Sequence, residues 1–273
     1  MNTVFKQGLF EGKTAIITGG GTGIGLRIAR EMAYLGATVI LASRKMTNLE
    51  KAVALIKAEG GKAFAIECNI RDEESVKNCV KQALELTGKI DYLVNNGGGQ
   101  FPSPVDMITS KGWNAVIDTN LTGTFMMSKE VFNKQFTNTG GAIVNITANV
   151  GRGFPMMAHT GAARAGVENM TRTMASEWGK YGVRVNCVAP GTINSSGLDS
   201  YAAPYKEFIL QFAKNNQAQR LGTEAEISAP VIFLLSPAAA FISGITLIAD
   251  AAESLFSPVM PPSENNMNPP FEG

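Results

Sequence analysis

The chain has 273 residues, 45% of them hydrophobic and 17% charged, which suits one large folded core. Its net charge of +1 gives no reason to expect a nucleic-acid partner, and no apolar run reaches the roughly 18 to 20 residues of a membrane span. Three scattered cysteines predict reduced thiols of a cytoplasmic protein, and a single histidine excludes a His-rich metal site, so we expect no metal.

The predicted strands are short, mostly apolar runs that alternate with segments of helical spacing. The runs are 13–18, 38–43, 63–67, 91–96, 142–147, 184–189 and 246–249, and two of the helical segments are 26–36 and 166–182. Such strands are typical of a parallel sheet covered on both faces. The alternation predicts a single α/β domain over residues 1–256, a doubly wound (Rossmann) sheet of about seven strands with helices on both faces. The Pro- and Asn-rich residues 257–273 are expected to form an extended or mobile tail.

A glycine-rich loop, "TGGGTGIG" at 18–25, stands between the first predicted strand and the first helix. Glycines there let the backbone approach a pyrophosphate, whose charge lies at the helix N-terminus, although glycines also form ordinary turns. The position of the loop favours a dinucleotide site. Its candidate cofactor-binding residues are Gly19, Thr22, Gly23, Ile24 and Gly25.

The end of the second predicted strand indicates which dinucleotide is bound. An NAD site has a carboxylate there for the ribose 2′-hydroxyl, but "VILASRKM" at 39–46 contains no acid. Ser43, Arg44 and Lys45 could instead hold a 2′-phosphate, which a guanidinium can bind through two hydrogen bonds. The alternative is a solvated loop with two surface cations. We predict NADP as the cofactor, with NAD less favoured.

These motifs, together with "NNGGG" at 95–99, "NLTG" at 120–123, "PGTI" at 190–193 and "HTGAARAG" at 159–166, resemble the short-chain dehydrogenase/reductase family. The resemblance covers residues 10 to 255. It is closest to the branch of the peroxisomal trans-2-enoyl-CoA reductases, the 2,4-dienoyl-CoA reductases and the bacterial oxidoreductases of citronellol and geraniol breakdown. It implies a substrate lid at about 195–220 and a homotetramer or homodimer.

By position, the resemblance also implies roles for individual residues. Cofactor contacts fall on Asn69, Ile70, Asn95, Gly97, Arg164, Pro190, Gly191 and Ile193 in addition to the loop residues. Asn69 stands where an aspartate usually holds the adenine amine, and its amide oxygen can still accept that hydrogen bond. Asn120 matches the asparagine that anchors a proton-relay water.

The chain departs from the family at the reaction centre. Thr147 stands at the serine position, Thr160 at the tyrosine position and Arg164 at the lysine position. A threonine hydroxyl is too weak an acid to replace tyrosine alone, and an arginine stays protonated. The neighbouring His159 is a candidate acid because its usual pKa suits proton transfer, although a lone histidine at a helix start more often caps or packs.

The chain offers few other candidate acids. By resemblance, Glu168 stands where the enoyl-CoA reductases have their active tyrosine. The active tyrosine of the dienoyl reductases falls at about Val150 in this chain. Tyr201 and Tyr205 lie in the expected lid. The sequence thus offers no tyrosine at any of the positions that the family uses.

The missing tyrosine bears on the type of reaction. Ketone reduction puts an alkoxide on the carbon that receives hydride, so it needs a proton donor at that point. Reduction of an enoyl thioester moves the charge to the thioester oxygen, where neutral donors such as Thr147 and Thr160 can hold it. We therefore expect an enzyme that reduces the C=C bond of an enoyl-CoA or a similar apolar substrate. The alternatives are a dehydrogenase or reductase of an apolar alcohol or aldehyde, and an NADP-binding protein without hydride transfer.

Overall fold

Seven parallel strands form one sheet in the order β3-β2-β1-β4-β5-β6-β9 in the computed structural model, which describes residues 2–200, 203–211, 216–255 and 268–273. The strands are β1 (Thr14–Thr18), β2 (Thr38–Ser43), β3 (Lys62–Glu67), β4 (Tyr92–Asn95), β5 (Gly141–Ile146), β6 (Val183–Pro190) and β9 (Thr246–Ala249). The predicted fold class is confirmed. The strand order reverses between β1 and β4, and in open parallel sheets ligands bind at such a point, outside the carboxyl ends of the strands.

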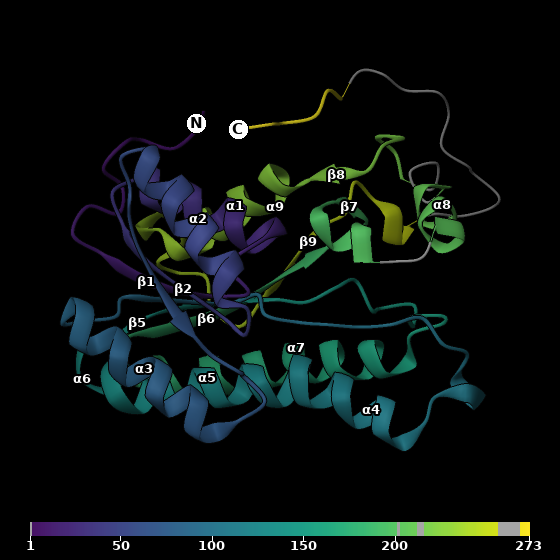
Figure 1. Ribbon diagram of the computed structural model, residues 1–273, viewed down its shortest axis with the longest axis horizontal. Coiled ribbons are helices and arrows are strands. Elements are labelled where there is room, and N and C mark those ends of the chain that lie inside the picture. Colours follow the sequence, from purple (N-terminus) through teal and green to yellow (C-terminus); the bar gives the residue numbers. More distant parts are fainter. Residues whose placement is uncertain (1, 201–202, 212–215, 256–267) are drawn as a thin grey trace.

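Helices cover both faces of the sheet, as Figure 1 shows. One layer holds α1 (Gly23–Tyr34), α2 (Met46–Ala58) and α9 (Glu224–Leu235). The other holds α3 (Glu73–Thr87), α4 (Ser110–Ile117), α5 (Gly123–Val131), the short α6 (Thr137–Thr139) and α7 (Ala158–Trp178). In the described residues no helix is both long and apolar enough to cross a membrane.

The core follows from the two-residue period of the strands. Ile17 and Leu41 face the layer of α1, α2 and α9, whereas their neighbours Ile16 and Ile40 face the layer of α3, α5 and α7, and all four side chains are fully buried. Each strand therefore contributes apolar side chains to two cores. This double burial explains why the strands read as continuous apolar runs in the sequence.

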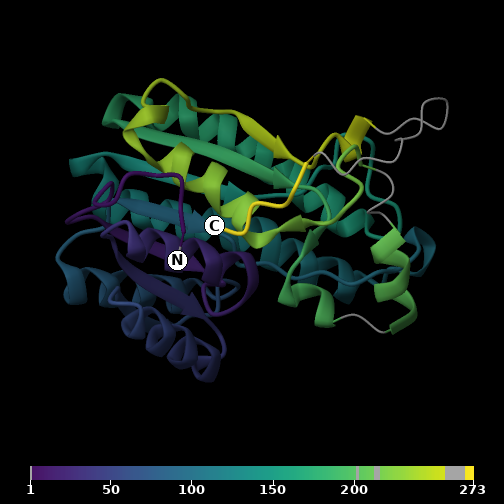
Figure 2. The same cartoon turned by 90° about the horizontal axis from the view of Figure 1, so that it is seen from above.

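Three features were not predicted from the sequence. A two-stranded sheet, β7 (Ile193–Asn194) with β8 (Gly222–Thr223), flanks the region that leads to α8 (Ala203–Gln211). The segment between α4 and α5 is a π-helical turn, Asp118–Thr122. Residues 268–273 of the expected tail are extended and return to the α1–α9 side, beside the described N-terminal segment in both views (Figure 1; Figure 2). Residues 257–267 of that tail lie outside the described residues.

Candidate functional site

The glycine loop is held against the end of β4 by Asn96. The Asn96 side-chain amide donates to the carbonyls of Thr18 and Gly19, at 3.1 and 3.3 Å. Gly19 has φ +65°, and a Cβ there would lie 2.8 Å from the Asn96 Nδ2 atom. Only glycine therefore fits this position without strain. The loop leaves a close path to the backbone, as a pyrophosphate requires.

The N-terminus of α1 faces serine side chains at the start of the predicted lid. Thr22 is the exposed N-cap residue, and its side chain makes no capping hydrogen bond. A Cβ at Gly23, which has φ +58°, would lie 3.2 Å from the Ser196 hydroxyl oxygen. Ile24 and Gly25 continue the first turn of the helix. The helix N-terminus, the free Thr22 hydroxyl and Ser196 together suit an anion.

A cavity of about 430 Å³ lies at the ends of β2 and β3, and Arg44 and Asn69 line it. Ser43 ends β2, and the side chains of Arg44 and Lys45 are exposed. No ion pair of these two cations occurs among the described residues. Ile70, next to Asn69, lies 3.1 Å from the position that a Cβ on Gly97 would take. Arg44 and Asn69 thus line one cavity, and its use by the adenosine end of a dinucleotide stays a prediction.

Asn95 does not join this group. Its buried amide donates to the Ser128 hydroxyl at 2.9 Å and to the Asn145 side-chain oxygen at 2.8 Å. It thus faces the α5–α7 layer, because successive side chains of a strand alternate. The Asn95 side chain therefore points away from the glycine loop, which Asn96 contacts instead, and its place beside the cofactor stays a prediction. Gly97 is in place, and its amide donates to the Thr18 hydroxyl at 2.9 Å.

Asn120 lies in the π-helical turn and holds the loop after β4. Its amide donates to the Gly99 carbonyl at 2.6 Å and to the Val116 carbonyl at 2.8 Å, and its side-chain oxygen accepts from the Gly99 amide at 3.3 Å. The residue is fully buried. The π-helical turn aims this side chain at the loop, consistent with the frequent use of such turns at functional sites.

Arg164 is a buried cation without a carboxylate partner among the described residues. One guanidinium nitrogen, Nη1, donates to the Ile146 carbonyl at 2.6 Å, and Nε has no hydrogen-bond partner. Burial lowers the pKa of Arg164 to about 10, so the side chain is charged at neutral pH. A Cβ on Gly98 would lie 2.6 Å from Arg164 Nη2 and 2.8 Å from Asn120 Oδ1. Gly98 thus packs directly against this cradle of Arg164 and Asn120, and Arg164 Nε keeps a donor without a partner among the described residues.

His159 and Thr160 begin α7 and are both fully buried. The Nδ1 atom of His159 accepts a hydrogen bond from the Thr160 amide at 2.8 Å and lies 3.3 Å from the Thr160 hydroxyl. The ring packs edge-on against Phe101, with centroids 4.6 Å apart, and its Nε2 atom has no partner in the described residues. Burial lowers the pKa of His159, which favours the neutral ring. This geometry supports the capping and packing role.

Thr147 lies at the end of β5, and its hydroxyl donates to the Val188 carbonyl at 3.3 Å. Glu168, one turn after Arg164 on α7, interacts with the hydroxyls of Thr147 and Thr246. Partial burial raises the pKa of Glu168 despite the nearby Arg172. Thr147 and Glu168 thus form a polar pair beside the predicted reaction centre. Tyr201 lies outside the described residues, as does the Tyr205 side chain.

Residues near the C-terminus hold the segment after β6 in place through hydrogen bonds. Pro190, Gly191 and Ile193 follow one another at the strand end, and Pro190 and Ile193 are buried. The carboxylate of Glu253 accepts from both the amide and the hydroxyl of Thr192, each at 2.9 Å. Asp250 accepts from the Asn149 side chain at 2.9 Å and thereby joins this segment to the loop after β5.

Sequence reasoning missed Asn96, Ser196, Asp250 and Glu253. A signal existed for Asn96, since it stands second in "NNGGG", next to the residue that was chosen. Glu253 lies 61 residues from Thr192 and Asp250 lies 101 residues from Asn149, so no local pattern marks these pairs.

Known proteins resemble the chain over most of its length. A family profile described as enoyl-(acyl carrier protein) reductase matches residues 19–251. Peroxisomal 2,4-dienoyl-CoA reductase [(3E)-enoyl-CoA-producing] of Rattus norvegicus is 37% identical over 258 residues, which cover 93% of this chain and 88% of the relative. A probable 2,4-dienoyl-CoA reductase [(2E)-enoyl-CoA-producing] of Bacillus subtilis (strain 168) is 34% identical over 248 residues, 90% of this chain and 98% of the relative.

The chain is also similar to proteins of known structure. Citronellol catabolism dehydrogenase (AtuB) of Pseudomonas aeruginosa PAO1 is 46% identical, with a TM-score of 0.85 over 93% of this chain and all of that chain. The fold, the glycine loop at the switch point and these similarities lead to one conclusion. The chain belongs to the short-chain dehydrogenase/reductase family of oxidoreductases.

Proposed function

We propose that the protein is an NADP-dependent oxidoreductase that reduces the C=C bond of an enoyl-CoA or a similar apolar unsaturated substrate. The observation that carries the proposal is Arg164, a buried cation without a carboxylate partner in the described residues, beside the hydroxyl-bearing Thr147 and Thr160. The centre thus supplies positive charge and dipoles in place of an acid. Several relatives are named as 2,4-dienoyl-CoA reductases, which supports the same class of substrate.

The residues fit an NADP molecule. The glycine loop and Thr22 would receive the pyrophosphate, and Asn69 the adenine. Arg44, exposed and without an ion-pair partner among the described residues, would bind the 2′-phosphate together with Ser43 and Lys45. The unpartnered Nε of Arg164 would meet the nicotinamide ribose. When bound, NADPH supplies the hydride.

Hydride addition at the β-carbon of an enoyl thioester places negative charge on the thioester oxygen. The fixed charge of Arg164 would stabilise that charge as it develops, and the Thr147 hydroxyl would assist by turning its proton from the Val188 carbonyl to the thioester oxygen. Asn120 keeps the loop after β4 in place against Arg164. Thr160 would hold the position of the helix start, because its hydroxyl is turned toward His159. Water would then deliver a proton to the α-carbon.

The test is NADPH oxidation with three substrates: an enoyl-CoA, a 2,4-dienoyl-CoA and citronellal. Turnover of a thioester with NADPH and not NADH supports the proposal. Turnover of citronellal alone contradicts it and supports a replacement acid, with His159 the first residue to test. NADPH binding without turnover of any substrate would support the alternative function, an NADP-binding protein without hydride transfer.

One observation favours the second candidate, oxidation or reduction of an apolar alcohol or aldehyde. The relative named for citronellol catabolism shares 46% of its residues with this chain, more than the dienoyl-CoA reductases above. The same substrate panel separates the two candidates.

We also propose that the protein acts in the cytoplasm as a homotetramer or homodimer. The edge strand β9 carries exposed Ile248, and Ile245 and Phe241 are exposed just before it. Such an apolar sheet edge suits burial against a second copy. A Phe241→Glu/Ile248→Glu variant should sediment as a smaller species than the parent protein, and an unchanged sedimentation coefficient would rule out this edge as the interface.

A further inference from the structure

The described part of the lid region rests on a narrow stem, the β7–β8 pair. Ile193 pairs with Gly222 and Asn194 pairs with Thr223, and the Gly222 amide donates to the Thr192 carbonyl at 3.0 Å. One arm of the stem continues the segment after β6, and the other leads into α9. Any motion of the stem therefore moves the segment that would line the nicotinamide ring.

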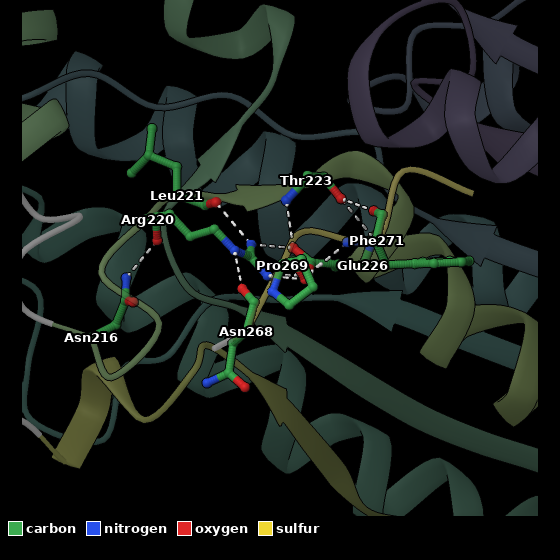
Figure 3. A network of polar contacts seen from close by, with 8 residues as sticks. All are labelled: Asn216, Arg220, Leu221, Thr223, Glu226, Asn268, Pro269 and Phe271. Atoms are coloured by element: carbon green, nitrogen blue, oxygen red, sulfur yellow. Dashed lines mark hydrogen bonds and ion pairs between the residues drawn. The ribbon is translucent and has the colours of Figure 1, made fainter. Parts of the chain in front are cut away.

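The chain's last described residues dock on this stem, as Figure 3 shows. The Thr223 hydroxyl donates to the Phe271 carbonyl at 2.6 Å and also accepts from the Glu226 amide at 3.2 Å. The Phe271 amide donates to the Glu226 carboxylate at 3.3 Å. The tail thus adds two hydrogen bonds to the capping box that begins α9.

Arg220 joins the stem to the tail from the other side. Its guanidinium makes two hydrogen bonds to the Glu226 carboxylate, at 2.8 and 2.6 Å. It also donates to the carbonyls of Asn268 and Pro269, at 3.2 and 3.4 Å, and to that of Leu221 at 3.2 Å. Figure 3 shows these contacts converging from the return arm of the lid, the start of α9 and the tail. One cation therefore connects the return arm of the lid and the start of α9 to a tail that is 48 to 49 residues away in sequence.

We propose that residues 268–271 form a strap that holds the stem of the lid, and that Arg220, Thr223 and Glu226 are positioning residues for the cofactor and substrate. The substrate part of this inference rests on the proposed function. The strap touches neither the glycine loop nor the cradle of Arg164, so it should change binding and leave the chemical step intact. Loosening the stem should weaken binding because the lid must then be ordered when the ligands bind.

The first experiment compares the full chain with a chain that ends after residue 267. In the shortened chain the Gly222 amide should exchange with solvent at least about tenfold faster, which corresponds to about 1.4 kcal/mol. The dissociation constant of NADPH and the KM for the thioester should rise about threefold to tenfold, with kcat within about twofold. The exchange and NADPH measurements need no turnover, so they test the strap even if the proposed substrate is wrong.

Point variants test the same contacts in the complete chain. Thr223→Val removes the hydroxyl, whereas Thr223→Ser keeps it, so the valine variant should reproduce the faster exchange and the serine variant should restore the parent rate. Arg220→Lys should also raise KM. The control is Lys13→Arg, because Lys13 pairs with Asp91 at 3.0 Å just before β1 and β4 begin, at the opposite end of the parallel strands from the stem.

Two results would overturn the strap. One is an unchanged exchange rate at Gly222 in both the shortened chain and Thr223→Val. The other is faster exchange throughout β1 to β6, which would make the tail a general stabiliser. If the shortened chain fails to fold, the exchange rates of the Gly222 amide in Thr223→Val and Thr223→Ser decide whether the strap holds the stem.

Discussion

At the scale of single residues, the proposed reaction centre is packed closely around Gly98. This glycine lies between the guanidinium of Arg164 and the amide oxygen of Asn120, with no space for a side chain. Gly99 next to it has open space, since a Cβ there would meet nothing within 4 Å. The two neighbours therefore make a matched pair for substitution.

We expect Gly98→Ala to lower kcat/KM at least about tenfold, because the new methyl group must displace Arg164 or Asn120, and tenfold corresponds to about 1.4 kcal/mol. Gly99→Ala should stay within about twofold of the parent. Steady-state kinetics on the accepted substrate checks both. Equal losses in the two variants would show that the Gly98 contact does not matter.

The uncompensated charge of Arg164 leads to a second prediction. Burying a charge without a partner destabilises the folded protein, so Arg164→Met should not lower the melting temperature of the ligand-free protein. The same variant should weaken NADPH binding at least about tenfold, since it removes the donors that would meet the ribose. Calorimetry measures the melting temperature, and fluorescence titration measures the dissociation constant of NADPH. The exposed Arg172 on the same helix provides the control, Arg172→Met.

At the scale of elements, the start of α7 lacks a capping side chain at Met157, and His159 compensates for it. Its Nδ1 atom satisfies the Thr160 amide, one of the free N–H groups of the first turn. The ring also fills the space beside Phe101. The helix start that carries Thr160 and Arg164 is thus fixed by a side chain from within the helix.

We expect His159→Asn, whose amide oxygen can accept the same bond, to keep kcat within about twofold. His159→Ala should lose about 0.5–2 kcal/mol of stability, as other lost caps do. Because burial lowers the pKa of His159, protonation opposes folding, and the stability of the parent should fall as pH drops below the ordinary value of 6.5. Melting curves across this range, with His159→Asn as the flatter reference, check the prediction. A collapse of kcat in His159→Asn would instead make His159 the acid.

At the scale of the whole molecule, two carboxylates of the C-terminal region connect distant parts of the chain. Burial alone would raise the pKa of Asp250, but hydrogen bonds from Ser254, Asn149 and Ala252 outweigh it and lower the pKa. Burial also opposes ionisation of Glu226, yet Arg220 and the amides of Thr223 and Phe271 lower its pKa. Both groups therefore stabilise the fold in their charged form.

A carboxylate with a lowered pKa stabilises the protein above its unfolded pKa and loses this effect as pH falls through the folded value. We therefore expect the contribution of Glu226 and Asp250 to persist above their ordinary values of 4.5 and 3.8 and to vanish below them. Thermal melts of the parent and of Asp250→Asn/Glu226→Gln should converge in this acidic range. Parallel melting profiles down to low pH would contradict the assignment.

The sequence by itself determined the class of fold and the place of the glycine loop between β1 and α1. Continuous apolar strands between amphipathic helices allow few solutions other than a parallel sheet covered on both faces, and all seven predicted strands are present. The glycine loop is a local motif, so Gly19 and Gly23 could be assigned from a few neighbouring residues. The family resemblance also followed from such local motifs and is confirmed.

The tertiary structure alone decided how side chains from distant segments meet. The choice between Asn95 and Asn96 depended on the strand pleat, because one residue of register exchanges the two faces. The hydrogen bond between Thr192 and Glu253 joins residues 61 positions apart, and that between Thr223 and Phe271 of the tail joins residues 48 positions apart. No periodicity records such pairs, since their contact arises only when the sheet has brought the carboxyl ends of its strands together.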